Sequence, residues 1–259
     1  VLDPRDPDVI YATTWQRIRL KWNDPRTYPD HQNNGIWKTT DGGNSWKQLT
    51  RGLPPSEYMG RTGIDVARSN PDVVYAFVDD YQIAYEAEEG ELDSYGRPME
   101  DVIRGATVYR SDDAGESWRQ VSGLTGESKK YMSQHSGTYG WVFGQMRVDP
   151  NDAERIYTLG LYINVSNDGG ATFERIGKDI HVDHHGMWID PDNSNYILAA
   201  HDGGISVSYD MGQNWRSFIP ELPLAQFYNV EYDMSEPFRV FGSIQDHHSY
   251  FTEVDLAMG

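Results

Sequence analysis

The sequence predicts an all-β fold, a β-propeller of four-stranded blades with about four to five blades present. Three observations support this. One turn motif occurs four times, a second, usually Pro-containing turn alternates with it, and no segment shows a sustained helical period of apolar residues. The mean interval between copies of the turn motif is about 56 residues, near the ~40–50 residues of one propeller blade. A β-sandwich of stacked hairpins is the alternative, which the matched turns disfavour.

The first motif spans eight residues, as in 39–46. It has a small hydroxyl residue at position 1, Asp at position 3, Gly at position 5 and an aromatic residue at position 8. Asp and Gly adopt turn conformations, and the carboxylate can accept hydrogen bonds from nearby backbone N–H groups. The aromatic ring can pack under the turn and bury a large apolar area. The residues expected to have this structural role are Asp41, Gly43, Trp46, Asp113, Gly115, Trp118, Asp168, Gly170, Phe173, Asp210, Gly212 and Trp215.

Each motif lies between two predicted strands, C and D, and the second turn joins strands A and B. The A–B pairs lie near residues 2–11, 66–75, 148–157 and 189–198, with a degenerate copy at 230–241. These pairs predict blades at 1–56, 57–127, 128–180 and 181–222, and a partial blade at 223–259. Because ragged ends would expose sheet edges, we expect a piece of a longer chain that forms a ring of six or more blades. A closed five-bladed ring is the alternative.

Composition excludes several functions. The net charge of −18 disfavours nucleic acid and anionic membrane surfaces as partners. The absence of Cys excludes disulfides and thiolate metal sites. The sequence has no run of 18 apolar residues, so it predicts no transmembrane helix in this stretch.

Strand order predicts which loops share a face. The A–B and C–D turns lie on one rim, and the variable D–A and B–C loops lie on the other, where binding loops are expected. Six of the eight His residues lie between 181 and 248, in predicted loops of this second rim. Neutral imidazoles with carboxylates suit Zn²⁺ or a similar divalent metal. The candidate metal ligands are His181, His184, His185, His201 and His247. The alternative is a hydrogen-bonded polar lining, since no compact metal motif is present.

Acid–base chemistry is a second possibility on the same rim. Glycoside hydrolysis needs two carboxylates about 5–5.5 Å or 6.5–9.5 Å apart. Asp183, Asp202 and Asp246 are the candidate catalytic residues, and Asp79 and Asp80 are further candidates at the start of a long insertion. The turn-motif aspartates are excluded because they are expected on the opposite rim.

Two long B–C insertions, about 15–34 and 79–104, carry aromatic and charged residues that suit a sugar or a peptide groove. Packing against a neighbouring blade or domain is the equally weighted alternative. The candidate ligand-binding residues on the whole rim are Trp15, Trp22, Tyr81, Tyr139, Trp141, His185, His201 and His247.

The four motifs resemble the Asp-box, or bacterial neuraminidase repeat, of sialidases, xyloglucan-active glycoside hydrolases, photosystem assembly propellers and sortilin-type receptors. The stretch 181–191, with His201-Asp202-Gly203-Gly204 and Gln226-Phe227-Tyr228, resembles large secreted bacterial proteins labelled sortilin-like or glycosyl hydrolase. The resemblance implies a bacterial protein that is secreted, periplasmic or on the cell surface. Sialidase activity would require an arginine cluster with a Tyr/Glu nucleophile pair, and the sequence has no such signature.

The leading hypothesis is therefore a non-catalytic binding or assembly module that engages a protein, peptide or polysaccharide on its loop-rich rim, beside further blades of its own chain. A glycoside hydrolase that uses two rim carboxylates is the first alternative. A metal-dependent hydrolase at the His/Asp set is the second. We expect no cofactor, with a divalent metal left open.

Overall fold

The computed structural model describes residues 1–16, 33–92, 96–99, 101–124, 144–218, 227–244 and 248–254. Regular structure in these residues is β apart from a single 3-10 turn, η2 (Ser56–Tyr58). This confirms the all-β prediction. No helix in the described part of the chain has the length and apolar character needed to cross a membrane.

The strands form four four-stranded antiparallel sheets and one three-stranded sheet, in chain order within each sheet. We number these sheets blades 1 to 5. Blade 1 contains β1 (Leu2–Asp3), β2 (Asp6–Thr14), β3 (Gly35–Thr39) and β4 (Lys47–Leu49). Blade 2 contains β5 (Met59–Val66), β6 (Val74–Tyr85), β7 (Val102–Ser111) and β8 (Arg119–Gln120). Blade 3 contains β9 (Gln145–Asp149), β10 (Asp152–Leu159), β11 (Ile163–Ser166) and β12 (Glu174–Ile176). Blade 4 contains β13 (His184–Ile189), β14 (Ile197–His201), β15 (Gly204–Ser208) and β16 (Arg216–Ser217), and blade 5 contains β17 (Phe227–Tyr232), β18 (Arg239–Ile244) and β19 (Ser249–Glu253).

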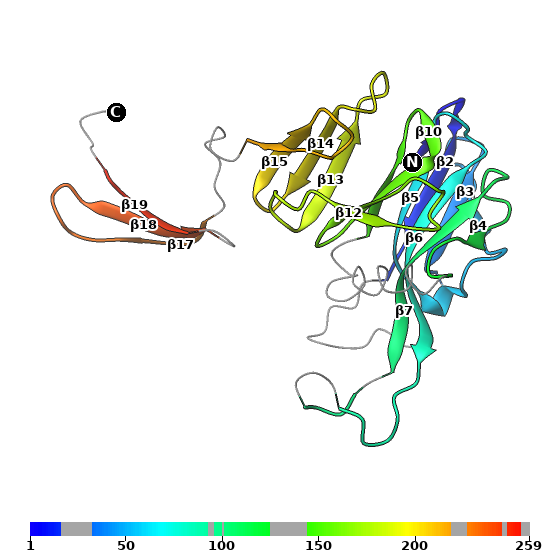
Figure 1. The fold of residues 1–259 in the computed structure, drawn as a ribbon, viewed down its shortest axis with the longest axis horizontal. Coiled ribbons are helices and arrows are strands. Elements are labelled where there is room, and N and C mark those ends of the chain that lie inside the picture. Colours follow the sequence, from blue (N-terminus) through cyan, green and yellow to red (C-terminus); the bar gives the residue numbers. More distant parts are fainter. Residues whose placement is uncertain are drawn as a thin grey trace.

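The first four blades pack side by side, because β5 of blade 2 contacts β2 of blade 1 and β9 of blade 3, and β9 contacts β13 of blade 4. Three apolar clusters fill the spaces between successive blades. Blade 5 stands apart from the others in Figure 1. The arrangement is that of propeller blades, as predicted.

The four turn motifs have one geometry. In the first, the Thr39 hydroxyl donates to the Asp41 carboxylate and accepts from the Gly43 N–H, at 2.6 and 3.0 Å. The second carboxylate oxygen accepts from the Ser45 hydroxyl, and this bond and its partners lower the pKa of Asp41 to about 2. The Trp46 indole N–H donates to the Gly43 carbonyl at 3.1 Å, so the ring packs under the turn.

The motif also joins neighbouring blades. A Cβ on Gly115 would lie 3.0 Å from Leu49 of blade 1, one on Gly170 would lie 2.8 Å from Val121 of blade 2, and one on Gly212 would lie 2.7 Å from Ile176 of blade 3. Each of these three turns therefore packs against the blade that precedes it in the chain. The contact residue of that blade always lies three positions after the aromatic residue of its own turn motif. Trp118 and Phe173 are accordingly buried, whereas Trp46 of blade 1 is 41% exposed.

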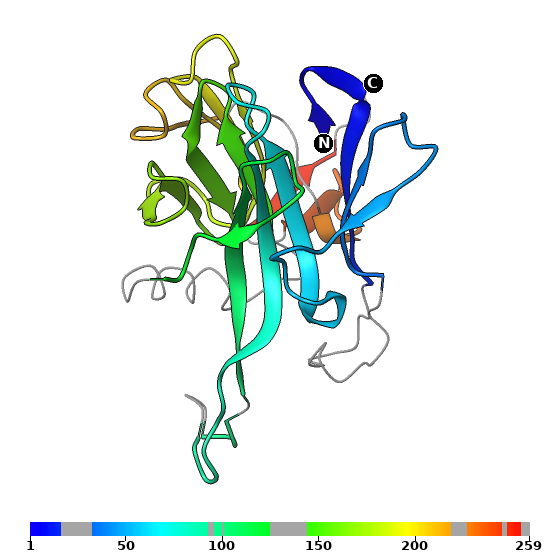
Figure 2. The same cartoon turned by 90° about the vertical axis from the view of Figure 1, so that its right-hand side faces the viewer.

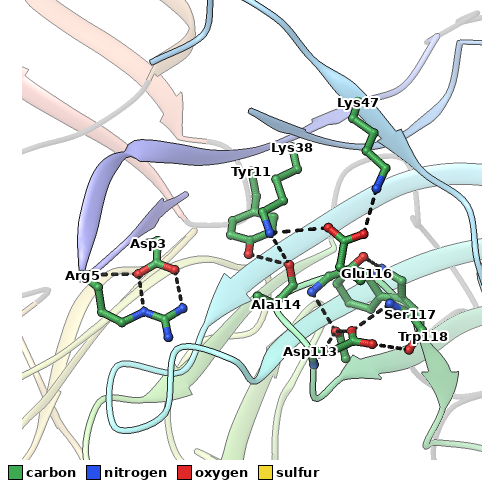
Figure 3. Close-up of polar contacts among 12 residues, drawn as sticks. Asp3, Arg5, Tyr11, Lys38, Lys47, Asp113, Ala114, Glu116, Ser117 and Trp118 are labelled. Carbon is green, nitrogen blue, oxygen red and sulfur yellow. Dashed lines mark hydrogen bonds and ion pairs between the residues drawn. The ribbon is translucent and has the colours of Figure 1, made fainter. Parts of the chain in front are cut away.

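Polar contacts add to the apolar packing of the blade 2 turn against blade 1 (Figure 3). The Tyr11 hydroxyl and the Lys38 ammonium group both donate to the Ala114 carbonyl at 2.8 Å. Lys47 forms an ion pair with Glu116 at 2.8 Å. The Asp-containing turn of blade 2 is thus held by the last three strands of blade 1.

Backbone hydrogen bonds confirm which turns share a rim. In blades 1 to 4, an N–H of the Asp-containing turn donates to a carbonyl of the A–B turn, as from Gly42 to Asp8 and from Gly169 to Glu154. The second insertion is not the loop that was expected. Strand β6 continues into it as far as Tyr85, strand β7 already begins at Val102, and the two strands pair with each other. Figures 1 and 2 show this hairpin projecting from the blades.

Candidate functional site

The candidate site lies where β13 begins and β14 ends, on the rim opposite the Asp-containing turns. His184 and His201 are cross-strand partners in this pair. The Asp202 N–H donates to the Asp183 carbonyl at 3.2 Å, which brings the two loops together. The His181 ring stacks on that of His201 at 6.1 Å. The structure therefore gathers the predicted residues of these two loops at one end of blade 4.

Two adjacent histidines at the start of β13 face opposite sides of the sheet. Successive side chains of a strand alternate between its two faces. The side chain of His184 is consequently buried, while that of His185 is 46% exposed. The strand begins beside a local irregularity, because Asp183 has a φ of 65° and the register shifts between His184 and Gly186.

Blade 3 holds this end of blade 4 in place. The N–H groups of Asp183 and His184 donate to the carbonyls of Leu161 and Gly160, at 3.1 and 2.8 Å. Below them, Met187 and Ala199 of blade 4 belong to the same apolar cluster as blade 3 residues. The rim residues therefore rest on a packed junction between two blades.

Two imidazoles in this junction are buried and neutral. His184 and His201 are 2% and 6% exposed, and their Nδ1 atoms have no hydrogen-bond partner among the described residues. His201 Nε2 bonds the Ser206 hydroxyl at 2.8 Å. Burial is the main cause that lowers the pKa of His184 to about 3 and that of His201 to about 4. Neighbouring imidazoles lower both pKa values further.

The exposed counterpart of this pair is made by His185 and Asp202. His185 Nε2 lies 2.8 Å from Asp202 Oδ1, and the two side chains are 46% and 32% exposed. The Asp202 carboxylate has acceptor positions besides the one that His185 occupies, and its side chain is partly open to solvent. This pair can therefore bind a polar ligand while its backbone is held by the buried residues.

The metal prediction covers the same residues. Among the residues that the structure describes, no three His, Asp or Glu side chains are arranged to hold a metal ion. Of the five proposed ligands, His247 lies outside the described residues. The buried rings of His184 and His201 face one another edge to face at 5.5 Å.

A second acidic group lies at the end of β6 in blade 2. The carboxylate of Asp80 is fully buried and accepts hydrogen bonds from the Tyr109 hydroxyl at 3.1 Å and the Gln82 N–H at 2.9 Å. Arg104 Nη1 lies 3.8 Å from it. Burial, followed by the neighbouring charge of Asp80, raises the pKa of Asp79 to about 7. Asp79 is therefore a carboxyl group that can exchange a proton near neutral pH.

Several residues that were predicted to contact a ligand are buried or half-buried in the structure. Tyr81 is 2% exposed, its hydroxyl hydrogen-bonds Asp79, and its ring fills the space beside Gly60, so it supports the carboxyl group rather than presenting a stacking surface. His201 is buried as described above. Trp15 is half-buried with its indole nitrogen enclosed. Five of the predicted residues lie outside the described residues, namely Trp22, Tyr139, Trp141, Asp246 and His247.

Sequence reasoning missed one feature, the face of blade 5 that carries Phe241 and Phe251. Their rings stack at 5.9 Å above a shallow cavity. The alternating residues in 239–243 and 249–253 indicate two strands, each with two chemically different faces. The sequence does not show which residues of the three strands lie on the same face, because this depends on the strand register.

The blades and their turn motifs define an Asp-box β-propeller, the class of fold that the sequence predicted. The chain matches no known protein-family model. It is 29% identical over 135 residues to a sialidase from Paraclostridium sordellii, which covers 44% of this chain and 32% of the sialidase. An ancestral GH74 enzyme matches with a TM-score of 0.51 and 13% identity, over 98% of this chain and 30% of the enzyme. The chain thus spans about a third of the length of each. A GH74 xyloglucanase from Xanthomonas campestris matches with a TM-score of 0.44 and 14% identity, over 96% of this chain and 42% of the enzyme.

Proposed function

We propose that this chain is part of an extracytoplasmic β-propeller that binds a carbohydrate on its loop-rich rim, with His185 and Asp202 as the contact residues. The observation that carries the proposal is the exposed His185–Asp202 pair, 2.8 Å apart above the packed junction of blades 3 and 4. The partial similarity to a sialidase supports a carbohydrate as the ligand class and a location outside the cytoplasm.

The His185–Asp202 pair offers a hydrogen-bond donor and acceptors that the structure holds in place. Sugar hydroxyls both donate and accept, so a carboxylate beside an imidazole can bond two neighbouring hydroxyls. The pair is fixed from below by the Asp202 N–H bond to Asp183 and by the blade 3 carbonyls. Side chains that are already ordered lose less entropy when a ligand binds.

The test is calorimetric titration of the purified chain with soluble neutral and sialylated oligosaccharides. We expect Asp202→Asn and His185→Ala each to weaken binding about tenfold. Asp192→Asn, which changes an exposed carboxylate of the A–B turn on the opposite rim, is the matched control and should bind as the native chain does. Native affinity in both rim variants, or binding of peptides but no oligosaccharide, would overturn the proposal.

A second candidate function is glycoside hydrolysis with Asp79 as the general acid. The specific observation in its favour is the pKa of about 7, which leaves the carboxyl group protonated under mildly acidic conditions. In this role Asp79 would donate its proton to the glycosidic oxygen as the bond to the anomeric carbon breaks, and a water molecule that loses a proton would add to that carbon. The test is release of reducing ends from xyloglucan and from sialyllactose, and Asp79→Asn should abolish any activity found. Absence of release by the native chain would reject this candidate.

A further inference from the structure

One face of blade 4 is apolar and open to solvent. Trp188 pairs with Leu198, and Ala200, two residues further along the same strand, pairs with Ile205. Since register partners and alternate residues share a face, these side chains lie on one side of the sheet. Trp188 and Ile205 are 48% and 41% exposed, and the Tyr196 ring packs edge to face against Trp188 at 5.8 Å. A contiguous exposed apolar surface of this kind marks a contact surface.

The same positions in blades 1 to 3 are covered by the next blade. Ile205 lies three residues before the first residue of its turn motif. Ile36, Val108 and Ile163 have this place in blades 1, 2 and 3. All three are completely buried, each in the apolar cluster that its blade forms with the blade that follows. The repeat therefore predicts that a following blade covers Ile205 as well.

Blade 5 carries the matching apolar face. The same backbone hydrogen bond closes the A–B turns of blades 4 and 5, which aligns the two sheets. By this alignment Val230 and Tyr232 correspond to Met187 and Ile189, which pack against blade 3 and are 5% and 7% exposed. Val230 and Tyr232 are instead 59% and 68% exposed, and Tyr250 on the same face is 51% exposed. Blade 5 thus presents to solvent the side that blades 2 to 4 turn toward the preceding blade.

The connection between the two blades has the length of one that already joins packed blades. Nine residues, 218–226, separate β16 from β17, and nine residues, 50–58, separate β4 from β5. Blade 2 packs directly on blade 1 across that second connection. Figure 1 shows blade 5 on the side of blade 4 that lies away from blade 3. A short connection also keeps the two apolar faces at a high effective concentration for one another.

A polar contact to the following blade accompanies the apolar packing. Arg147 Nε of blade 3 donates to the Met187 carbonyl of blade 4 at 3.0 Å, and the Asp65 carboxylate of blade 2 accepts from a blade 3 N–H at 2.9 Å. Trp188 has the position of Arg147 in blade 4, because an aliphatic residue and Asp-Pro follow both. Its indole N–H is a donor, and the Val230 carbonyl corresponds to that of Met187. The alignment therefore pairs a donor of blade 4 with an acceptor of blade 5.

We propose that blade 5, residues 227–254, packs against this face of blade 4 and buries Trp188 and Ile205 under Val230 and Tyr232. Removal of apolar surface from water on both sides drives the contact. By the strand order that all blades share, the β18–β19 connection then lies on the rim that carries Asp202. Blade 5 borders the proposed rim site in this arrangement, but its docking does not depend on what the rim binds.

The test is NOE spectroscopy on the native chain with labelled Val and Ile methyl groups. We expect contacts from the Trp188 indole protons to the Val230 methyls, and from the Ile205 methyls to those of Val240. A mixture of labelled and unlabelled chains shows whether each contact forms within one chain. The absence of these contacts in the native chain overturns the proposal, and so do contacts that form only between two copies.

A pair of variants tests the same face by amide hydrogen exchange. Ile205→Asp would place a charge under blade 5, so it should remove the contacts and speed the exchange of residues 239–244 at least about tenfold. Ile83→Asp is the matched control, because it changes a similarly exposed isoleucine, 37% exposed, in the projecting β6–β7 hairpin. Equal exchange of residues 239–244 in the two variants would reject the docking.

The measurements separate docking from rim binding. Asp202→Asn should leave the Trp188–Val230 contact in place, so loss of rim binding and loss of docking are observed independently. The NOE contacts of the native chain decide the outcome even where Ile205→Asp fails to fold.

Discussion

His184 and His201 face each other across the β13–β14 pair, with ring centroids 5.5 Å apart and planes at 81°. Both rings are buried at the junction of blades 3 and 4, below the exposed His185–Asp202 pair. This places two neutral bases where a proton would be poorly solvated. The relationship ties the stability of the blade junction to pH.

The first prediction concerns acid stability. The pKa values of His184 and His201 are about 3 and 4 in the folded chain and near 6.5 when unfolded, so the unfolded state binds more protons as the pH falls. Folding stability should decline as the pH falls below about 6.5, by at most about 1.4 kcal/mol per pH unit for each histidine, and level off below pH 3 to 4.

Urea unfolding between pH 7 and pH 4 measures this decline. The groups that face the two rings are His181, His185, Arg175 and Asp202, and none of them is changed in the test variant. His201→Gln should flatten the dependence by about half. An unchanged slope in that variant would contradict the assignment.

The second prediction concerns Asp79, whose linkage has the opposite sign. Its folded pKa of about 7 exceeds its ordinary value of 3.8, so the folded state holds the proton more tightly. This group should reduce stability progressively as the pH rises from about 4 to 7. As the pH rises over that range, the free energy of unfolding of Asp79→Asn should therefore fall less than that of the native chain. The difference should be up to about 1.4 kcal/mol per pH unit. The same urea series measures it, and parallel curves would refute the buried-acid interpretation.

The third prediction compares two turn glycines. Gly43 and Gly170 both have a φ of 94°, but an added Cβ would meet only the turn's own Trp46 at 3.8 Å in the first case and Val121 of the neighbouring blade at 2.8 Å in the second. Both alanine variants should lose about 1–2 kcal/mol to backbone strain. Gly170→Ala should lose about 1–3 kcal/mol more through overpacking between blades. Thermal unfolding of the two variants tests the role of the turn as a contact between blades, and equal losses would argue against it.

The fourth prediction compares two buried tyrosines. The Tyr11 hydroxyl donates to the Ala114 carbonyl across the junction of blades 1 and 2, whereas the Tyr157 hydroxyl is buried and has no hydrogen-bond partner among the described residues. Tyr11→Phe should cost about 0.5–1.5 kcal/mol, and Tyr157→Phe should be neutral or stabilising because it removes an unsatisfied polar group. Chemical denaturation of both variants is the measurement, and an equal cost at the two positions would count against the contact shown in Figure 3.

The blade architecture could be read from the sequence because the information is local. The Asp, Gly and aromatic positions of a turn such as 41–46 lie within a few residues of one another, so the same contacts form wherever the motif occurs. The approximate place of the His-rich loops also followed, since strand order alone decides which connections share a rim. The extension of β6 and β7 into the insertion was missed because its acidic residues favour solvent exposure but do not exclude pairing.

What the amino-acid order determined by itself is the repeating turn, the four-stranded unit and the clustering of histidines in loops of one rim. Only the tertiary structure decided that His184 points inward while His185 points out, that Tyr81 is buried beside Asp79, and that Ile36, Val108 and Ile163 lie buried between successive blades. The reason is that turn chemistry acts between near neighbours, whereas side-chain direction depends on strand register and on the blade that packs alongside.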